Sequence, residues 1–257
     1  MANKLAVITG ASSGIGLEIA RLAAGEGYEL IVASDTPQVD AGAGLKNLGV
    51  EVRSIDTDLS SQQGVQKLLD TIGDRQVDVL VANAGHGLGH AFLEQSTQDW
   101  THVIDTNITG TLLLLQPLAK KMVQRGEGRI LITGSIAGHV PAAFQAVYHA
   151  SKAFVDSFAA ALGNELKDTG VTVTCLKPGA TETEFFARAD MEDTKVGTSK
   201  KADPADVAKT GWDAMKKGEH AVVHGLMNKA QVLAAGVLPE SVTAEQGRKM
   251  NEPGSGQ

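Results

Sequence analysis

Tyr148 and Lys152 stand four residues apart in the segment Tyr148-His149-Ala150-Ser151-Lys152. In a helix, side chains at this spacing lie on one face. A free tyrosine titrates near ~10, so its phenol exchanges protons at neutral pH only when a nearby positive charge stabilises the phenolate. Lys152 is predicted to supply that charge. The pair therefore predicts a general acid or base, and an ordinary solvated helix face is the alternative.

A glycine-rich turn follows the first apolar run of the chain. It reads Thr9-Gly10-Ala11-Ser12-Ser13-Gly14-Ile15-Gly16, and the next residues have the apolar spacing of a helix. In such a turn backbone N–H groups can approach a pyrophosphate, and the helix dipole adds partial positive charge. The glycine spacing differs from the common G-x-G-x-x-G. The turn predicts a dinucleotide site, and a strand-to-helix connection that needs glycine for its geometry alone is the alternative.

Short apolar runs alternate with longer segments of helical period along the chain, as in repeated β-α units. The runs lie at 5–8, 29–33, 50–55, 78–82, 129–133, 171–176 and 220–223. They predict an α/β fold: a single-domain, Rossmann-like, doubly wound parallel sheet of about seven strands with helices on both faces. Helices are expected at 14–26, 61–72, 96–125 and 147–168. A further helix is expected to begin at Asp203-Pro204, a cap followed by proline at the first helical position.

Composition narrows the class of protein. The 257 residues contain no linker, so residues 1–238 are predicted to be one dinucleotide-binding and catalytic domain, followed by a polar tail, 239–257, that is partly disordered. A net charge of −7 argues against nucleic acid or an anionic membrane as a partner. No apolar run approaches the ~18 residues of a membrane span, and a cytoplasmic location is expected. The single cysteine, Cys175, lies in a β-branched run and is expected to be buried.

Several motifs together resemble the short-chain dehydrogenase/reductase family, in particular its subgroup of varied substrate specificity. The turn at 9–16 reads T-G-x-x-x-G-I-G, which resembles the cofactor fingerprint of the family. The remaining matching pieces, in chain order, are Asn83-Ala84-Gly85, Asn107, Ser135, Tyr148, Lys152, Pro178-Gly179 and Thr183. Their order and spacing match the family over roughly residues 4 to 225, and several motifs in register are far more specific than any one of them.

The resemblance implies hydride transfer between a nicotinamide and a carbonyl or carbinol carbon. It implies that Tyr148 is the general acid or base and that Ser135 hydrogen-bonds the same substrate oxygen. It further implies that Lys152 holds the nicotinamide ribose, and that Asn107 holds a helix distortion and a water that connects Lys152 to solvent. The implied cofactor contacts are Gly10, Ser12, Ser13, Gly14, Ile15, Gly16, Asp35, Asp58, Leu59, Asn83, Ala84, Gly85, Tyr148, Lys152, Pro178, Gly179, Thr181 and Thr183. No metal is implied.

Asp35 bears on which dinucleotide binds. It follows the second predicted strand, where a carboxylate can hydrogen-bond the adenosine ribose hydroxyls and repel a 2′-phosphate. NAD(H) is therefore favoured and NADP(H) is possible. However, Asp35 lies one residue beyond the usual carboxylate position, and a loop role is its alternative. For Asp58 the alternative is a turn or cap.

The substrate pocket is expected to be walled by 85–90, by 136–144 and by the stretch 185–200, for which a mobile lid is a hypothesis. Phe144, Phe185 and Phe186 could face an apolar substrate. Ordinary loop or surface roles are expected for His86, His90, His139 and His149. The segment 225–229 resembles the ending of the varied subgroup, so the expected substrate is a small aldehyde, ketone or secondary alcohol.

Two other classes of function stay open at this point. One is a dinucleotide-binding regulatory protein without turnover, and the other is an epimerase or lyase that uses the cofactor transiently. The helices beginning at Ser96 and Val147 carry more apolar faces than one side of a sheet needs. A homodimer or homotetramer is therefore expected.

Overall fold

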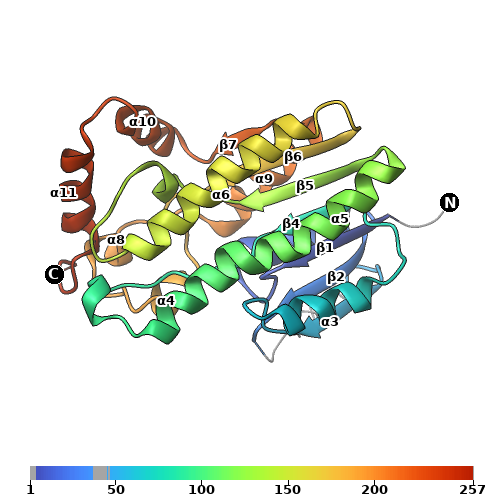
Figure 1. Ribbon diagram of the computed structural model, residues 1–257, viewed down its shortest axis with the longest axis horizontal. Coiled ribbons are helices and arrows are strands. Elements are labelled where there is room, and N and C mark those ends of the chain that lie inside the picture. The colour runs from blue at the N-terminus through green and yellow to red at the C-terminus, as the bar shows by residue number, and fades with distance from the viewer. Residues whose placement is uncertain (1–3, 37–44, 46, 257) are drawn as a thin grey trace.

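A seven-stranded sheet forms the centre of the protein (Figure 1). The structure, a computed structural model, describes residues 4–36, 45 and 47–256. The strands are β1 (Leu5–Thr9), β2 (Glu29–Ser34), β3 (Val52–Asp56), β4 (Val79–Ala82), β5 (Gly128–Thr133), β6 (Val171–Lys177) and β7 (Ala221–Val223). All pair in parallel, in the order β3-β2-β1-β4-β5-β6-β7. The predicted doubly wound α/β sheet is confirmed, because each predicted apolar run forms one strand.

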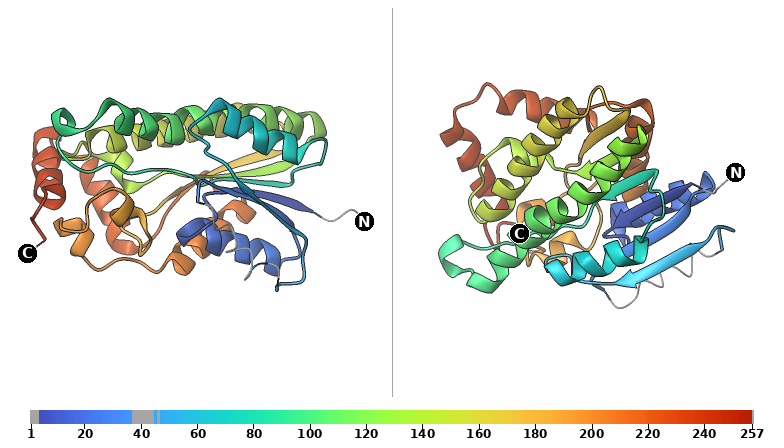
Figure 2. Two further views of the ribbon diagram at one scale, coloured as in Figure 1. Left: turned by 90° about the horizontal axis from the view of Figure 1, so that it is seen from below. Right: turned by 45° about the vertical axis from the view of Figure 1, so that its right-hand side comes forward.

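Helices cover both faces of the sheet (Figure 2). One face carries α3 (Gln62–Ile72), α4 (Thr97–Ile104), α5 (Thr111–Arg125) and α6 (Ala146–Glu165), and the other carries α1 (Gly14–Gly25) and α9 (Pro204–Lys217). Asp203 caps α9 as predicted, since its carboxylate accepts from the N–H of Ala205 at 2.8 Å. The short helices η1 (Phe92–Glu94), η3 (Ile136–His139), α7 (Phe185–Arg188) and α8 (Lys195–Thr198) lie in connections.

The strands read as continuous apolar runs because both faces of the sheet are buried. In β1, Leu5 and Val7 pack with α3, α5 and α6, whereas Ala6 and Ile8 pack with α1 and α9. Successive side chains point to opposite faces of a strand, so one five-residue strand contributes to two cores. The two cores, one on each face, hold the strands in position between the helices.

A π-helical turn, η2 (Asp105–Gly110), interrupts the long helix predicted at 96–125. The helix begins as predicted, because the Ser96 hydroxyl accepts from the N–H of Asp99 at 3.1 Å. The interruption contains Asn107, for which a local helix distortion is expected. Such π-turns are rare and concentrate at functional sites.

The segment predicted to be a partly disordered polar tail, 239–257, contains a helix that packs against the rest of the domain. Helix α10 (Leu226–Ala235) is followed by α11 (Glu240–Asn251) and a turn. The N–H of Gly254 donates to Asp193 at 2.8 Å, and Arg248 lies over the ring of Phe144. Polar composition did not reveal these contacts because they depend on distant segments. Residues 1–3 and 257 of the predicted domain and tail lie outside the described residues.

Within the part of the chain that the structure describes, no helix combines the length and apolar character needed to cross a membrane.

Because the core is closely packed, we expect a cavity in a central strand to lower the free energy of unfolding. Leu80 of β4 is fully buried. We expect Leu80→Ala to lower the free energy of unfolding by about 2–5 kcal/mol, because it removes buried methyl groups and leaves a cavity. Urea denaturation measures this, with Leu93→Ala, at a side chain that is 94% exposed, as the control. Equal effects of the two substitutions would contradict the packing described.

Candidate active site

A cavity of about 890 Å³ opens at the carboxyl edge of the sheet. It extends from the ends of β2 and β3, past the turn before α1, to the ends of β5 and β6. Eighteen of the predicted site residues line it: Gly10, Ser12, Ser13, Gly14, Ile15, Asp35, Asp58, Leu59, Asn83, Ala84, Gly85, Ser135, Tyr148, Lys152, Pro178, Gly179, Thr181 and Thr183. Gly16 and Asn107 are not in its wall and lie behind it. A β-carbon at Gly16 would come within 2.2 Å of the Gly10 carbonyl, so Gly16 permits the turn to fold tightly.

Asn83 connects the ends of the three central strands. Its Nδ2 donates to the carbonyls of Thr9, at 3.2 Å, and Gly10, at 3.1 Å. Its Oδ1 accepts from the Thr133 hydroxyl at 3.0 Å. The Thr9 hydroxyl accepts from the N–H groups of Asn83 and Ala84, each at 3.0 Å. The glycine turn is therefore tied directly to the strand that carries the catalytic segment.

The glycine turn leaves the first N–H groups of α1 without a side-chain cap. Gly10 and Gly14 have φ of +62° and +57°, which favour glycine. Ser13 precedes α1, but its hydroxyl makes no cap hydrogen bond, and the first turn contains no acidic side chain. Ser61, Ser96 and Asp203 do cap their own helices. These donors and the helix dipole fit a pyrophosphate, so the residues present fit a dinucleotide along the cavity.

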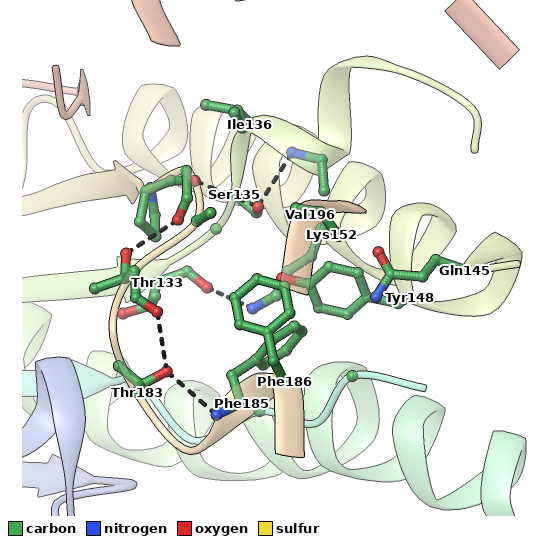
Figure 3. Close-up of a pocket in the computed structure, with 18 of the residues that line it drawn as sticks. Thr133, Ser135, Ile136, Gln145, Tyr148, Lys152, Thr183, Phe185, Phe186 and Val196 are labelled. Atoms are coloured by element: carbon green, nitrogen blue, oxygen red, sulfur yellow. Dashed lines mark hydrogen bonds between the residues drawn. The ribbon is translucent and has the colours of Figure 1, made fainter. Parts of the chain in front are cut away.

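Tyr148 and Lys152 lie side by side on α6, with the Lys152 Nζ atom 5.9 Å from the Tyr148 ring centre (Figure 3). Both are buried. Burial raises the pKa of Tyr148 to about 12. A hydrogen bond with the Ser135 hydroxyl lowers this pKa by a smaller amount, and the Asp156 charge raises it. The lowering of this pKa by Lys152 together with an oxidised nicotinamide stays a prediction. Burial, which spacing does not show, raises the pKa in the protein by itself.

Burial also lowers the pKa of Lys152 to about 8, with Asp156 acting in the opposite direction. Its Nζ donates to the Thr133 carbonyl at 2.8 Å. Because the ammonium is held by a carbonyl at the end of β5, it faces the same cavity as the phenol. A lysine of this pKa can gain and lose a proton near neutral pH.

Asn107 joins the π-helical turn to the loop after β4. Its Oδ1 accepts from the His86 N–H at 2.8 Å, and its Nδ2 donates to the His86 carbonyl and the Ser151 hydroxyl, each at 2.9 Å. The side chain is 2% exposed. It therefore fixes the cavity wall to α6. The predicted water link to Lys152 stays a prediction.

Asp156 is a buried carboxylate beneath the Ser135 segment that the motif pattern did not reveal. It lies 3.2 Å from Lys177 Nζ and 3.5 Å from His139 Nε2. A β-carbon at Gly134 would lie 1.9 Å from its Oδ1, so glycine there lets the carboxylate approach. Its spacing could have indicated it, because Asp156 follows Lys152 by four residues, as Lys152 follows Tyr148, and residues at this spacing share a helix face.

Asp35 lies directly after β2 at the opposite end of the cavity. Its Oδ2 is 3.1 Å from His86 Nε2. This hydrogen bond holds the pKa of Asp35 down to about 2, with smaller lowering effects of the His86 and Arg188 charges. Asp35 is thus an ionised cavity residue, and His86 is its partner rather than an ordinary loop residue. Asp58 also lines the cavity, but its carboxylate accepts from the N–H and hydroxyl of Ser60, as the turn alternative expects.

Apolar side chains surround the Tyr148 end of the cavity (Figure 3). The Phe185 ring centre lies 5.1 Å from that of Tyr148. A β-carbon at Gly87 would lie 2.3 Å from Phe185, so this glycine makes room for the ring. Phe186 lines the cavity as predicted, but Phe144 does not. The sequence did not predict that α10, α11 and the connection between them also line the cavity, through Met227, Asn228, Gln231, Val232, Ala234, Ala235, Leu238, Thr243, Gln246, Gly247, Met250 and Asn251.

The other histidines and the cysteine have structural partners of their own. His149 Nδ1 is 2.8 Å from the Val140 carbonyl, and His90 Nε2 is 2.8 Å from Asp190 on the surface. Cys175 is free and buried, as expected, and burial raises its pKa to about 12. Among the described residues no cluster of three or more His, Cys, Asp or Glu side chains could hold a metal ion.

Comparison with known proteins identifies the family. The family model for short chain dehydrogenases matches residues 4–194. An uncharacterized oxidoreductase of Staphylococcus saprophyticus is 33% identical over 227 residues, covering 86% of this chain and 95% of the relative. A short-chain dehydrogenase from Sphingobium yanoikuyae in complex with NADPH has a TM-score of 0.81 and 27% identity, over 92% of this chain and 96% of that one. A short-chain dehydrogenase/reductase from Burkholderia phymatum in complex with NAD has a TM-score of 0.80 and 26% identity, over 90% and 92%.

The chain belongs to the short-chain dehydrogenase/reductase family. Within it, the protein is an NAD(P)-dependent oxidoreductase that acts on alcohol or carbonyl groups.

The lowered pKa of Lys152 predicts a characteristic pH dependence of stability. Unfolded lysine keeps its proton to about pH 10.4, whereas buried Lys152 releases it near pH 8. Between these values the unfolded chain binds more protons, so raising the pH favours the folded state. From pH 7 to 9.5 we expect this group to add on the order of 1–2 kcal/mol, and Lys152→Met to lose that increment. Urea denaturation of both proteins at both pH values measures it; identical pH dependence would show that Lys152 titrates normally.

Proposed function

We propose that the protein transfers a hydride between a nicotinamide dinucleotide, preferably NAD(H), and a small carbonyl compound or secondary alcohol. One observation carries the proposal: Tyr148, Ser135 and Lys152 share one end of a cavity whose other end presents Asp35. The uncapped start of α1 lies between them, at the position that suits a pyrophosphate.

Tyr148 is the proton donor in the reducing direction. Its pKa of about 12 keeps the phenol protonated until an alkoxide develops beside it. The Ser135 hydroxyl lies within reach of the same phenol. It donates to the Pro178 carbonyl at 3.4 Å, a long hydrogen bond that it can exchange for one to the substrate oxygen. A bound nicotinamide supplies or accepts the hydride.

Lys152 restores the proton and stabilises a phenolate in the oxidising direction. Its ammonium is buried beside the phenol and has a pKa of about 8, so it holds a proton at neutral pH and can release it. It also has donors free for ribose hydroxyls, because its described hydrogen bond is the one to Thr133. Asn107 keeps the wall next to it in place.

The apolar wall indicates what the substrate carries next to its reacting carbon. Phe185 and Phe186 approach the phenol from α7, and Ile136 and Val196 line the same end of the cavity. Burial of apolar surface there favours a substrate with an apolar substituent. Residues 185–200 are proposed to close over it, although Met191 within this stretch is buried and Asp193 is held by the tail.

Asp35 supports the preference for NAD(H). An ionised carboxylate at the end of β2 can accept hydrogen bonds from both adenosine ribose hydroxyls and repels a 2′-phosphate. Its alternative role in a loop is less consistent with its place in the cavity wall.

We also propose that the protein associates into a homodimer or homotetramer through α5 and α6. A cytoplasmic location is part of the same proposal.

A substrate screen tests the reaction class directly. Aldehydes, ketones and secondary alcohols are offered with NAD(H) and NADP(H), and the absorbance of the reduced nicotinamide is followed. A net absorbance change supports hydride transfer to or from the substrate. Product formation without that change would indicate an epimerase or lyase, and dinucleotide binding without turnover of any compound would indicate a regulatory protein.

Tyr148→Phe removes the proposed proton donor and keeps the ring. We expect kcat to fall by about 10²–10⁴-fold, since that is the range of general acid–base contributions. Dinucleotide affinity should change by less than about threefold, because binding free energy comes from many other contacts. Steady-state kinetics and calorimetry measure the two effects, and near-normal turnover would refute the proposed role of Tyr148.

Asp35→Ala removes the charge that opposes a 2′-phosphate. We expect the ratio of kcat/KM for NADP(H) to that for NAD(H) to rise by about tenfold or more, as expected for loss of a charged hydrogen-bond acceptor. Asp56→Ala, at an exposed position at the end of β3 outside the cavity wall, is the matched control. Unchanged kinetics with both dinucleotides would assign Asp35 to the loop alone.

A further inference from the structure

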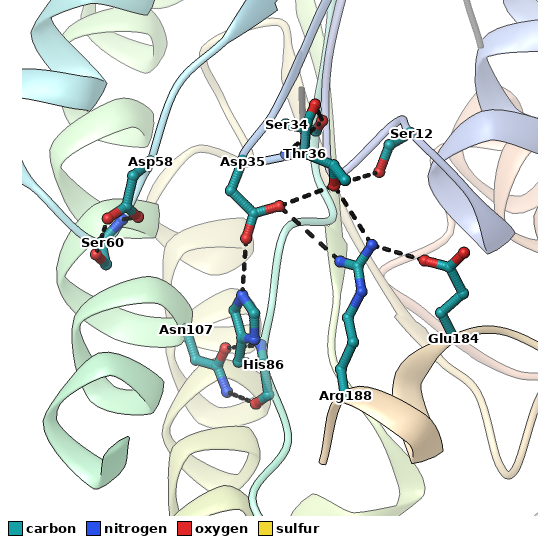
Figure 4. A network of polar contacts seen from close by, with 10 residues as sticks. All are labelled: Ser12, Ser34, Asp35, Thr36, Asp58, Ser60, His86, Asn107, Glu184 and Arg188. Atoms are coloured by element: carbon teal, nitrogen blue, oxygen red, sulfur yellow. Dashed lines mark hydrogen bonds and ion pairs between the residues drawn. The ribbon is translucent and has the colours of Figure 1, made fainter. Parts of the chain in front are cut away.

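Arg188 lies against the end of β2 although 152 residues separate it from Thr36 (Figure 4). Its side chain comes from α7, the short helix that also carries Phe185. One guanidinium nitrogen lies 3.4 Å from the Thr36 hydroxyl, and another lies 3.9 Å from Asp35 Oδ1. The first also donates to Glu184 at 2.7 Å.

The guanidinium is therefore at the adenosine end of the cavity. The Thr36 hydroxyl that it contacts is 3.4 Å from the hydroxyl of Ser12 in the glycine turn. Ser12, Asp35 and Arg188 all line the cavity. A ribose held between the glycine turn and the end of β2 would have its 2′ position among these three side chains.

We propose that Arg188 is a specificity-determining residue that binds the 2′-phosphate of NADP(H), so that the site accepts both dinucleotides. This inference rests on the proposed function, since it concerns the same dinucleotide site. The preference that Asp35 gives for NAD(H) is then limited, because Arg188 opposes it. Selectivity is set by the pair and not by the carboxylate alone.

The charges around Asp35 support this assignment. Its Oδ2 pairs with His86 at 3.1 Å, and its Oδ1 accepts from the Thr36 hydroxyl at 3.3 Å and lies near Arg188. The carboxylate is already compensated from two sides, so its repulsion of a further anion is reduced. The neighbouring positions 12, 13 and 34 are all serine, so none of them supplies a basic side chain at this end of the cavity.

The guanidinium has the geometry and access that a phosphate needs. It carries five N–H donors in a planar fork that matches phosphate oxygens. Its side chain is 36% exposed, so donors remain available beyond the contacts described. The hydroxyls of Ser12 and Thr36 can add neutral hydrogen bonds on either side.

Glu184 competes for the same guanidinium. It lies one helical turn before Arg188, and its side chain is 62% exposed. A phosphate that binds Arg188 must share it with this carboxylate. Neutralising Glu184 should therefore strengthen phosphate binding while Arg188 itself is unchanged. The proposal thus has a second test, in which the affinity for the phosphate is expected to rise and not to fall.

Calorimetric titration with two fragments that undergo no redox reaction tests the proposal. The fragments are 2′,5′-ADP, which has the 2′-phosphate, and 5′-AMP, which lacks it. We expect the wild-type protein to bind 2′,5′-ADP with an affinity within about tenfold of that for 5′-AMP. Arg188→Ala should weaken 2′,5′-ADP about tenfold or more and leave 5′-AMP within about threefold, the effect of losing charge-assisted hydrogen bonds. Arg188→Lys should be intermediate, and Glu184→Gln should tighten 2′,5′-ADP selectively.

Arg21→Ala, on the outer side of α1, is the matched control and should change neither affinity. Thermal unfolding of each variant separates a folding defect from lost binding. Equal weakening of both fragments by Arg188→Ala, or weakening of neither, would overturn the assignment. If the wild-type protein binds 5′-AMP but rejects 2′,5′-ADP, this inference fails while the proposed function stands; if it binds neither, the dinucleotide site itself is refuted.

Discussion

The hydrogen bonds of Asn83 are the constraint on which the site depends. Parallel strands end with backbone groups that no further ladder satisfies, and such buried groups need partners. A single amide closes this gap between β1, β4 and β5, with its donors on Thr9 and Gly10 and its acceptor on Thr133. Thr133 in turn accepts from Lys152 through its carbonyl. The glycine turn and α6, which carries Tyr148 and Lys152, are thereby held in one frame at the carboxyl edge of the sheet.

Burial gives the two groups on α6 opposite shifts that suit proton transfer. It disfavours the charged form of each, so the pKa of Tyr148 rises to about 12 and that of Lys152 falls to about 8. In the proposed mechanism the buried tyrosine is therefore the proton donor, and the lysine exchanges its proton. Asp156, one helical turn after Lys152, raises the pKa of Lys152 and so favours its charged form. Its carboxylate packs under the Ser135 segment, where Gly134 leaves room for it. One stretch of helix thus sets both the protonation and the placement of the site.

Patterns within single elements of the sequence predicted the fold, but they did not predict the contacts between segments that are distant in the sequence. Each strand followed from an apolar run because parallel strands are buried on both faces. The turn before α1 and the Tyr148–Lys152 pair followed from spacing within one element. By contrast, the packing of the polar tail depends on contacts with Asp193 and Phe144, which are far away in the sequence. The burial that raises the Tyr148 pKa and the approach of Arg188 to Asp35 could not be predicted from spacing, because both are properties of the packed molecule.

Helix α7 links the two ends of the cavity. Phe185 at its start lies 5.1 Å from the Tyr148 ring, and Arg188 at its end reaches Asp35 and Thr36. Under the proposed role of Arg188, a 2′-phosphate held at one end of α7 would restrain Phe185 at the other end. Binding energy gained far from the reacting carbon can be used to orient the substrate, so we expect cofactor recognition and substrate positioning to be coupled through this helix.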